Sequence, residues 1–283
     1  MLEPRFVQAN GLRFGYLEHG AGPLVLLVHG FPDTAYTWDK LMPALAEGGY
    51  RAVAPFTRGY YPTEIPTNGP FDDETRARDL LALIAALGAE AAIVIGHDWG
   101  ATAAYAAAAL APEHIRLLVT LAIPHPQAIK PRPRMIWALR HFLALRRDGA
   151  AAKIRKGNYQ YVDELWERWS PAWRPIPAAE LVQVKRAFAQ PGCLEAACAY
   201  YKTISPKLPK AHRMPITVPT ISFAGEHDDL LKPRTFEKAR HCFTGSYEVI
   251  QIPGGHFMHR EHAADFNAEL VRVLHDHDRR TKS

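Results

Sequence analysis

Residues 92–101 read AIVIGHDWGA, and this stretch decides the fold. The apolar run 92–95 is typical of a strand that is buried on both faces of a parallel sheet. Residues 102–111 predict a helix that stops before Pro112. The turn between them, Gly96-His97-Asp98-Trp99-Gly100-Ala101, matches the strand–turn–helix context of a nucleophile elbow. Small residues two positions before and after the centre let strand and helix approach closely and tolerate a strained backbone between them.

The central residue of this elbow is Asp98, where esterases carry serine. A serine alkoxide is suited to attack on an acyl carbon, whereas a carboxylate displaces a leaving group at an sp³ carbon and becomes an alkyl ester. The alternative is that Asp98 only caps the helix that follows it. The flanking glycines and the preceding strand favour the nucleophile.

The rest of the chain alternates strands and helices around this elbow. A hairpin of residues 5–8 and 12–17 turns at Asn10-Gly11. Further strands are expected at 24–28, 51–54, 117–123, 220–224 and 247–252, and helices at 79–87, before Gly88, and at 263–274. This rhythm predicts an α/β protein with a mostly parallel, doubly wound sheet. The polar tail 275–283 is expected to fray.

The rhythm breaks after the sixth strand. Residues 125–212 show proline-punctuated helical patterns that are rich in Trp and Tyr, with no good strand among them. We therefore predict a helical cap, or lid, over 125–212, inserted into a core made of residues 1–124 and 213–283.

A base, its orienting acid and an oxyanion hole are expected at other strand ends. His256 follows the strand 247–252 and is the predicted base, and Asp228, after the strand 220–224, is preferred to Asp229 as its partner. His259 and His262 are expected to be exposed to solvent. After the strand 24–28 comes His29-Gly30-Phe31-Pro32, so the amides of Phe31 and Trp99 are the predicted oxyanion donors.

Composition limits the partners of the protein. The chain has 283 residues, 48% of them hydrophobic, and a formal net charge of +5. No apolar run reaches the ~18 residues of a membrane span, and the N-terminus does not resemble a signal peptide, so a cytoplasmic protein is expected. The segment 130–156 holds nine Lys/Arg against one acid, Asp148. Its apolar residues are interleaved, which favours a solvated helix face over a patch that binds nucleic acid or a partner.

These motifs resemble the epoxide hydrolase and haloalkane dehalogenase branch of the α/β-hydrolase superfamily. The resemblance implies lid tyrosines that hydrogen-bond an epoxide oxygen and protonate it as the ring opens. Tyr201, in Ala199-Tyr200-Tyr201-Lys202, matches one of them, while Tyr200 is either a substrate contact or a core aromatic. The second tyrosine aligns with His141, which leaves His141 as a donor and Tyr159 and Tyr161 as its substitutes.

The Asp-Trp elbow does not separate the two activities of this branch. A dehalogenase needs halide donors, of which Trp99 is one and Trp137, in the lid, a weaker candidate, since Phe31 stands where an Asn would serve. No arginine follows Asp98 to hold a haloacid. We therefore expect an epoxide hydrolase, with a haloalkane dehalogenase and a non-catalytic small-ligand receptor as alternatives. The resemblance implies a small hydrophobic epoxide and water as reactants, Trp137 and Tyr200 as substrate contacts, a monomer or homodimer, and no cofactor or metal; the three cysteines have no metal-ligand spacing.

Overall fold

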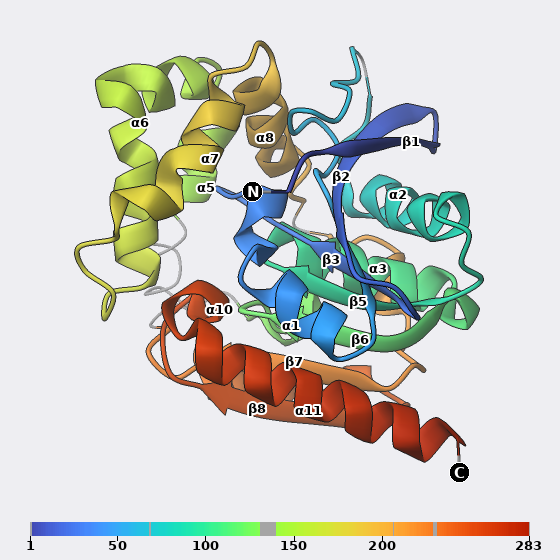
Figure 1. Ribbon diagram of the computed structural model, residues 1–283. Coiled ribbons are helices and arrows are strands. Elements are labelled where there is room, and N and C mark those ends of the chain that lie inside the picture. Colours follow the sequence, from blue (N-terminus) through green and yellow to red (C-terminus); the bar gives the residue numbers. More distant parts are fainter. Residues whose placement is uncertain (1, 68, 131–139, 206, 229–230, 283) are drawn as a thin grey trace.

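The computed structural model describes residues 2–67, 69–130, 140–205, 207–228 and 231–282. Its eight strands form one sheet in the order β1-β2-β4-β3-β5-β6-β7-β8 (Figure 1). Only the pairs β1–β2 and β2–β4 are antiparallel, so the predicted mostly parallel sheet is confirmed. The strands are β1 Arg5–Ala9, β2 Leu12–His19, β3 Leu24–Val28, β4 Arg51–Pro55, β5 Ala92–His97, β6 Ile115–Leu121, β7 Thr220–Gly225 and β8 Tyr247–Ile252.

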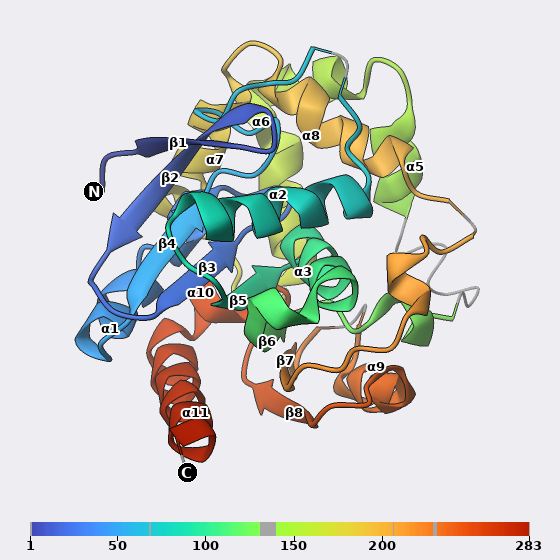
Figure 2. The same cartoon turned by 90° about the vertical axis from the view of Figure 1, so that its right-hand side faces the viewer.

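Helices cover both faces of this sheet (Figures 1 and 2). On one face α1 (Leu41–Glu47) packs against α11 (Ala263–Lys282), and their apolar side chains share one buried cluster with the strands. On the other face lie α2 (Asp73–Ala86) and α3 (Trp99–Leu110), in a second cluster, and α9 (Pro233–Lys238) packs against β7 and β8. Strands such as β3, all of whose residues are buried, are apolar throughout because they have helices on both sides.

The described part of the chain between β6 and β7 is mainly helical, as predicted. Four helices, α5 (Arg140–Arg146), α6 (Ala150–Trp169), α7 (Ala178–Phe188) and α8 (Cys193–Lys202), gather at one end of the sheet (Figure 1). A short helix, α10 (Met258–Glu261), follows β8 near them. The limits 125 and 212 for a separate cap stay a prediction. None of the helices that the structure describes is both long and apolar enough to span a membrane.

Local signals in the sequence fix several of these boundaries. Asn10 and Gly11 have φ angles of 45° and 75°, which makes the tight turn of the β1–β2 hairpin. Gly88 follows α2 with φ 80°, a conformation that favours glycine. Helix α2 begins six residues earlier than predicted, because the side chain of Asp72 accepts a hydrogen bond of 2.9 Å from the Thr75 amide. The first turns of α2 are polar, so the sequence shows no helical spacing of apolar residues there.

The expectation that residues 275–283 fray is wrong, because α11 continues to Lys282. Its polar residues have partners on the core. The Asp278 carboxylate accepts a hydrogen bond of 2.9 Å from the Tyr50 hydroxyl and pairs with Arg116 at 2.7 Å. His275 contacts the Gly48 carbonyl oxygen through Nε2 at 3.1 Å. These polar contacts anchor the end of α11, although its sequence there has no helical spacing of apolar residues.

We expect Asp278→Ala to lower the free energy of unfolding by about 1–2 kcal/mol, since it removes two hydrogen bonds to a partly buried charge. Asp276→Ala is the matched control on the same helix, because Asp276 pairs only with the exposed side chains of Arg272 and Arg279, and it should cost less than about 0.5 kcal/mol. Urea denaturation followed by circular dichroism measures both. Equal losses for the two variants would show that the Asp278 contacts do not anchor α11.

Candidate active site

Asp98 lies where β5 ends and α3 begins, in a strained backbone conformation with φ 52° and ψ −119°. Its side chain makes no capping hydrogen bond to α3, so the structure does not favour the cap alternative. Two glycines make this turn possible. A Cβ atom at Gly100 would lie 2.2 Å from the Val28 carbonyl oxygen, and one at Gly96 would lie 2.5 Å from the Gly100 carbonyl oxygen. The predicted close approach of strand and helix is therefore present.

The two carboxylate oxygens of Asp98 have different surroundings. Oδ1 accepts a hydrogen bond of 2.8 Å from the amide of Phe31, and Oδ2 lies 3.5 Å from His256 Nε2. Glycine at position 30 lets the Phe31 loop come this close, since a Cβ there would lie 2.4 Å from Oδ1 and 2.7 Å from the Trp99 amide nitrogen. The amides of Phe31 and Trp99 thus border the space around one carboxylate oxygen.

His256 lies between two carboxylates. Its Nδ1 is 3.7 Å from Asp228 Oδ2, while Asp228 Oδ1 accepts a hydrogen bond of 3.0 Å from the Leu231 amide. Burial disfavours the charged imidazolium, but the contacts with Asp228 and Asp98 outweigh it and raise the pKa of His256 to about 9. Burial likewise disfavours the Asp98 carboxylate, yet its contacts with His256 lower the pKa of Asp98. Both shifts favour a charged His256 beside a charged Asp98. Asp229 lies outside the described residues.

One inserted helix fixes the loops on both sides of this arrangement. At the end of α6, the Trp169 carbonyl oxygen accepts a hydrogen bond of 2.8 Å from the His256 amide, and Ser170 Oγ accepts one of 3.2 Å from the Phe257 amide. The Trp166 indole nitrogen donates a hydrogen bond of 3.0 Å to the Pro32 carbonyl oxygen, and its ring stacks on Phe257 with centroids 3.7 Å apart. Helix α6 therefore ties the base loop to the oxyanion loop.

Tyr201 and His141 both come from the inserted helices to the neighbourhood of Asp98. The ring of Tyr201, on α8, meets Trp99 and Phe31 edge-on, with centroid distances of 5.1 and 5.2 Å. Burial and the charge of Asp98 raise the pKa of Tyr201 well above its usual value, so its hydroxyl keeps its proton. The buried His141 ring lies 6.2 Å from that of Tyr201. Trp137 lies outside the described residues.

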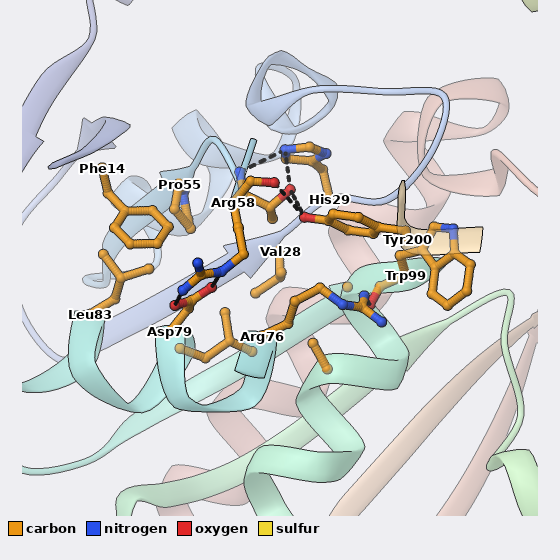
Figure 3. Close-up of a pocket in the computed structure, with 14 residues that line it drawn as sticks. Phe14, Val28, His29, Pro55, Arg58, Arg76, Asp79, Leu83, Trp99 and Tyr200 are labelled. Carbon is orange, nitrogen blue, oxygen red and sulfur yellow. Dashed lines mark hydrogen bonds and ion pairs between the residues drawn. The ribbon is translucent and has the colours of Figure 1, made fainter. Parts of the chain in front are cut away.

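Tyr200, the neighbour of Tyr201, has a hydroxyl that is already engaged. It donates a hydrogen bond of 2.7 Å to the Arg58 carbonyl oxygen. Figure 3 shows Tyr200 lining a small hollow beside Trp99, together with His29 and the Arg58–Asp79 ion pair. The Arg76 guanidinium lies 4.6 Å from the centre of the Tyr200 ring. This arrangement favours the core aromatic over the substrate contact.

The two substitutes for His141 lie on α6. Tyr159 and Tyr161 are both partly buried and pack against the main apolar cluster. Tyr159 has φ 63°, within a kink of the helix at residues 156–159. In the described part of the basic segment, Arg146, Arg147, Lys153 and Lys156 are exposed. Exposed cations fit a solvated face and a binding patch equally, so the solvated face stays a prediction.

The expectation that His259 is exposed is wrong. The short helix α10 turns this side chain inward, where it is 3% exposed and packs on Trp38 with ring centroids 4.9 Å apart. Its Nε2 lies 2.7 Å from Thr37 Oγ1. The burial of this histidine depends on a partner more than 200 positions away, and nothing in its local sequence signals it. The side chain of His262 is 36% exposed, in line with expectation.

Comparison with known proteins shows what the whole chain is similar to. A family model described as the alpha/beta hydrolase fold matches residues 23–263. The AB hydrolase superfamily protein YfhM of Bacillus subtilis is 30% identical, over 95% of this chain and 97% of the relative. An epoxide hydrolase of Caballeronia sordidicola is 29% identical, over 95% and 92%. The crystal structure of epoxide hydrolase A from Mycobacterium thermoresistibile is 26% identical, with a TM-score of 0.81 over 97% of this chain and 98% of that one.

The indole hydrogen bond from α6 can be tested by comparing two buried tryptophans. Trp166 donates to Pro32, whereas the indole nitrogen of Trp38 is buried without a partner. Both Trp→Phe changes lose similar ring volume, so we expect Trp166→Phe to cost about 1 kcal/mol more free energy of unfolding than Trp38→Phe. Urea denaturation of both variants measures the difference. A smaller cost for Trp166→Phe would mean that this hydrogen bond does not hold the helix in place.

Proposed function

The chain belongs to the α/β-hydrolase fold family, and on that premise we propose that it is an epoxide hydrolase, which converts an epoxide and water into a vicinal diol. One observation carries the proposal. The Asp98 carboxylate stands on a strained elbow with Oδ1 bound by the Phe31 amide and Oδ2 turned to His256. The names of several relatives support the substrate class.

In the first step Asp98 Oδ2 attacks an epoxide carbon. Oδ2 is the attacking atom because Oδ1 is held by the Phe31 amide. The carbon–oxygen bond of the epoxide breaks, and its electron pair goes to the epoxide oxygen, which takes a proton from the Tyr201 hydroxyl. His141 is the second donor toward this oxygen. The product is a hydroxyalkyl ester on Asp98.

Alkylation also prepares the base. The ester is neutral, so one of the two negative charges that hold a proton on His256 disappears when it forms. His256 then releases its proton to solvent, and Tyr201, which gave its own proton to the epoxide oxygen, takes one up from solvent. The neutral imidazole, still oriented by Asp228, takes a proton from a water molecule that attacks the Asp98 carbonyl carbon. Oδ1 becomes the oxyanion between the amides of Phe31 and Trp99. Its collapse breaks the bond between the Asp98 carbonyl carbon and the ester oxygen, and the departing alkoxide takes the proton of the new Asp98 carboxyl group and leaves as the diol.

A haloalkane dehalogenase is the second candidate, and one observation favours it. A leaving halide needs N–H donors, and the indole nitrogen of Trp169 is buried without a hydrogen-bond partner. Its ring lies 5.1 Å from that of His256 and 5.0 Å from that of His141. Together with Trp99 it supplies the pair of donors that the dehalogenase alternative requires. A purely binding role has no use for a strained Asp98 paired with His256, so the receptor alternative has less support.

The covalent step is tested by the intact mass of His256→Gln after incubation with styrene oxide. Because the variant lacks the base but keeps the nucleophile, we expect a mass gain equal to one whole epoxide molecule. The double variant Asp98→Ala/His256→Gln should show none. The epoxide hydrolase proposal would be wrong if neither styrene oxide nor a panel of other epoxides gave an adduct. An alkyl adduct and bromide release with a bromoalkane would then establish the haloalkane dehalogenase.

The proton donor is tested by a matched pair of Tyr→Phe variants on α8. We expect Tyr201→Phe to slow single-turnover alkylation by about 10²- to 10⁴-fold, the usual contribution of a positioned general acid. Tyr200→Phe removes a hydroxyl that bonds to the Arg58 carbonyl oxygen, so it should lower stability and leave alkylation within about threefold of the parent. Stopped-flow tryptophan fluorescence follows the step. Unchanged alkylation in Tyr201→Phe would remove Tyr201 from the mechanism.

A further inference from the structure

Three buried polar side chains converge behind the candidate active site. Each lies within three residues of one of its groups: Asp33 follows Phe31 by two residues, His97, the last residue of β5, directly precedes Asp98, and His259, in α10, follows His256 by three. The three are 4%, 0% and 3% exposed. One potential ligand atom from each lies within 4.8 Å of the other two.

The partners of these side chains decide where their protons are. His97 Nε2 lies 3.0 Å from the His256 carbonyl oxygen, which can only accept, so Nε2 carries the hydrogen and Nδ1 is a lone pair. The Thr37 hydroxyl hydrogen-bonds to the Asp33 carboxylate and also contacts His259 Nε2 at 2.7 Å. When the Thr37 proton points to the carboxylate, His259 Nε2 is a donor as well and His259 Nδ1 is a second lone pair.

Three acceptor atoms are left without partners: Asp33 Oδ2, His97 Nδ1 and His259 Nδ1. Burying acceptor atoms that face one another away from water costs free energy unless a proton or a cation lies between them. A proton on Asp33 would satisfy only one of the other two atoms, whereas a divalent cation satisfies all three.

We propose that Asp33, His97 and His259 form a binding site for one divalent transition metal ion of the Zn²⁺ or Co²⁺ class. Two imidazole nitrogens and one carboxylate oxygen are ligands that these ions favour. A tetrahedral ion holds its ligands about 3.3 Å apart, so binding draws together ligand atoms that lie up to 4.8 Å apart in this structure. The sequence has no metal-ligand spacing here because the ligands come from three distant segments.

The ion acts as a clamp and takes no part in the proposed chemistry. It joins the segments that carry the oxyanion amide of Phe31, the nucleophile Asp98 and the base His256. His97 links the ion to the nucleophile and to the base. Its backbone continues into Asp98, and its ring hydrogen-bonds to the His256 carbonyl oxygen. Binding of the ion depends on these contacts and not on which substrate the enzyme takes.

The site is tested by producing the chain in cells grown with Co²⁺, so that the ion can enter during folding. Metal content is measured by elemental mass spectrometry and coordination by visible absorption. We expect about one Co²⁺ per chain with the absorption bands of a low-coordinate ion. His259→Gln should lose at least nine-tenths of it, while His262→Gln, which changes a half-exposed histidine in the same segment, should keep it.

Stability gives a second reading of the same site. The loaded parent should melt at a higher temperature than the parent freed of metal, because the ion binds only the folded chain, and His259→Gln should show no such difference. His97→Asn serves as a second ligand variant if His259→Gln folds poorly. A parent chain that takes up no Co²⁺, or one whose Co²⁺ content is the same in His259→Gln, would overturn the proposal.

Discussion

The close approach of β3, β5 and α3 is the constraint on which the site depends. Asp98 has a backbone conformation that side chains rarely adopt, and it is maintained because the neighbouring backbone leaves no room for relaxation. Gly100 packs against the Val28 carbonyl oxygen and Gly30 against the Asp98 side chain, each at a distance that forbids a Cβ. The packing of the sheet core therefore maintains the strained backbone of Asp98. In this conformation the Asp98 carboxylate points away from α3 and toward the loops above it.

The rest of the site is assembled by contacts that are distant in the sequence. The His256 amide bonds to Trp169, and the Pro32 carbonyl oxygen accepts from Trp166, so the inserted helix α6 completes what the core begins. Because the same helix holds both loops, a displacement of α6 moves the base and the oxyanion amides together. The positions of the proposed base and of the proposed oxyanion amide of Phe31 are thus coupled through one helix end.

The sequence predicted what depends on neighbours in the chain. The elbow, the strand ends that carry Asp228 and His256, and the glycine that ends α2 all rest on local patterns, and the structure brings Asp98, His256 and Asp228 together. It did not predict what depends on distant partners. The last turns of α11 rely on Tyr50 and Arg116, and the burial of His259 on Thr37 and Trp38. Polar residues of this kind look the same in a frayed tail as in an anchored helix.

The histidines around Asp98 show why position alone does not make a base. His29, His97, His256 and His259 are all buried, and burial alone lowers the pKa of an imidazole. It does so for His29, to about 4, and for His97, to about 3. His256 differs because it contacts two carboxylates, and its pKa is raised to about 9 instead. Since one of those carboxylates is the proposed nucleophile, the charge that holds the proton on His256 is the charge that alkylation removes. The Asp98 charge also raises the pKa of His29 and of His97, but in those two rings burial outweighs it. In His256 the two carboxylates outweigh burial, so alkylation of Asp98 weakens the hold on its proton and the two steps of the proposed reaction are ordered by electrostatics.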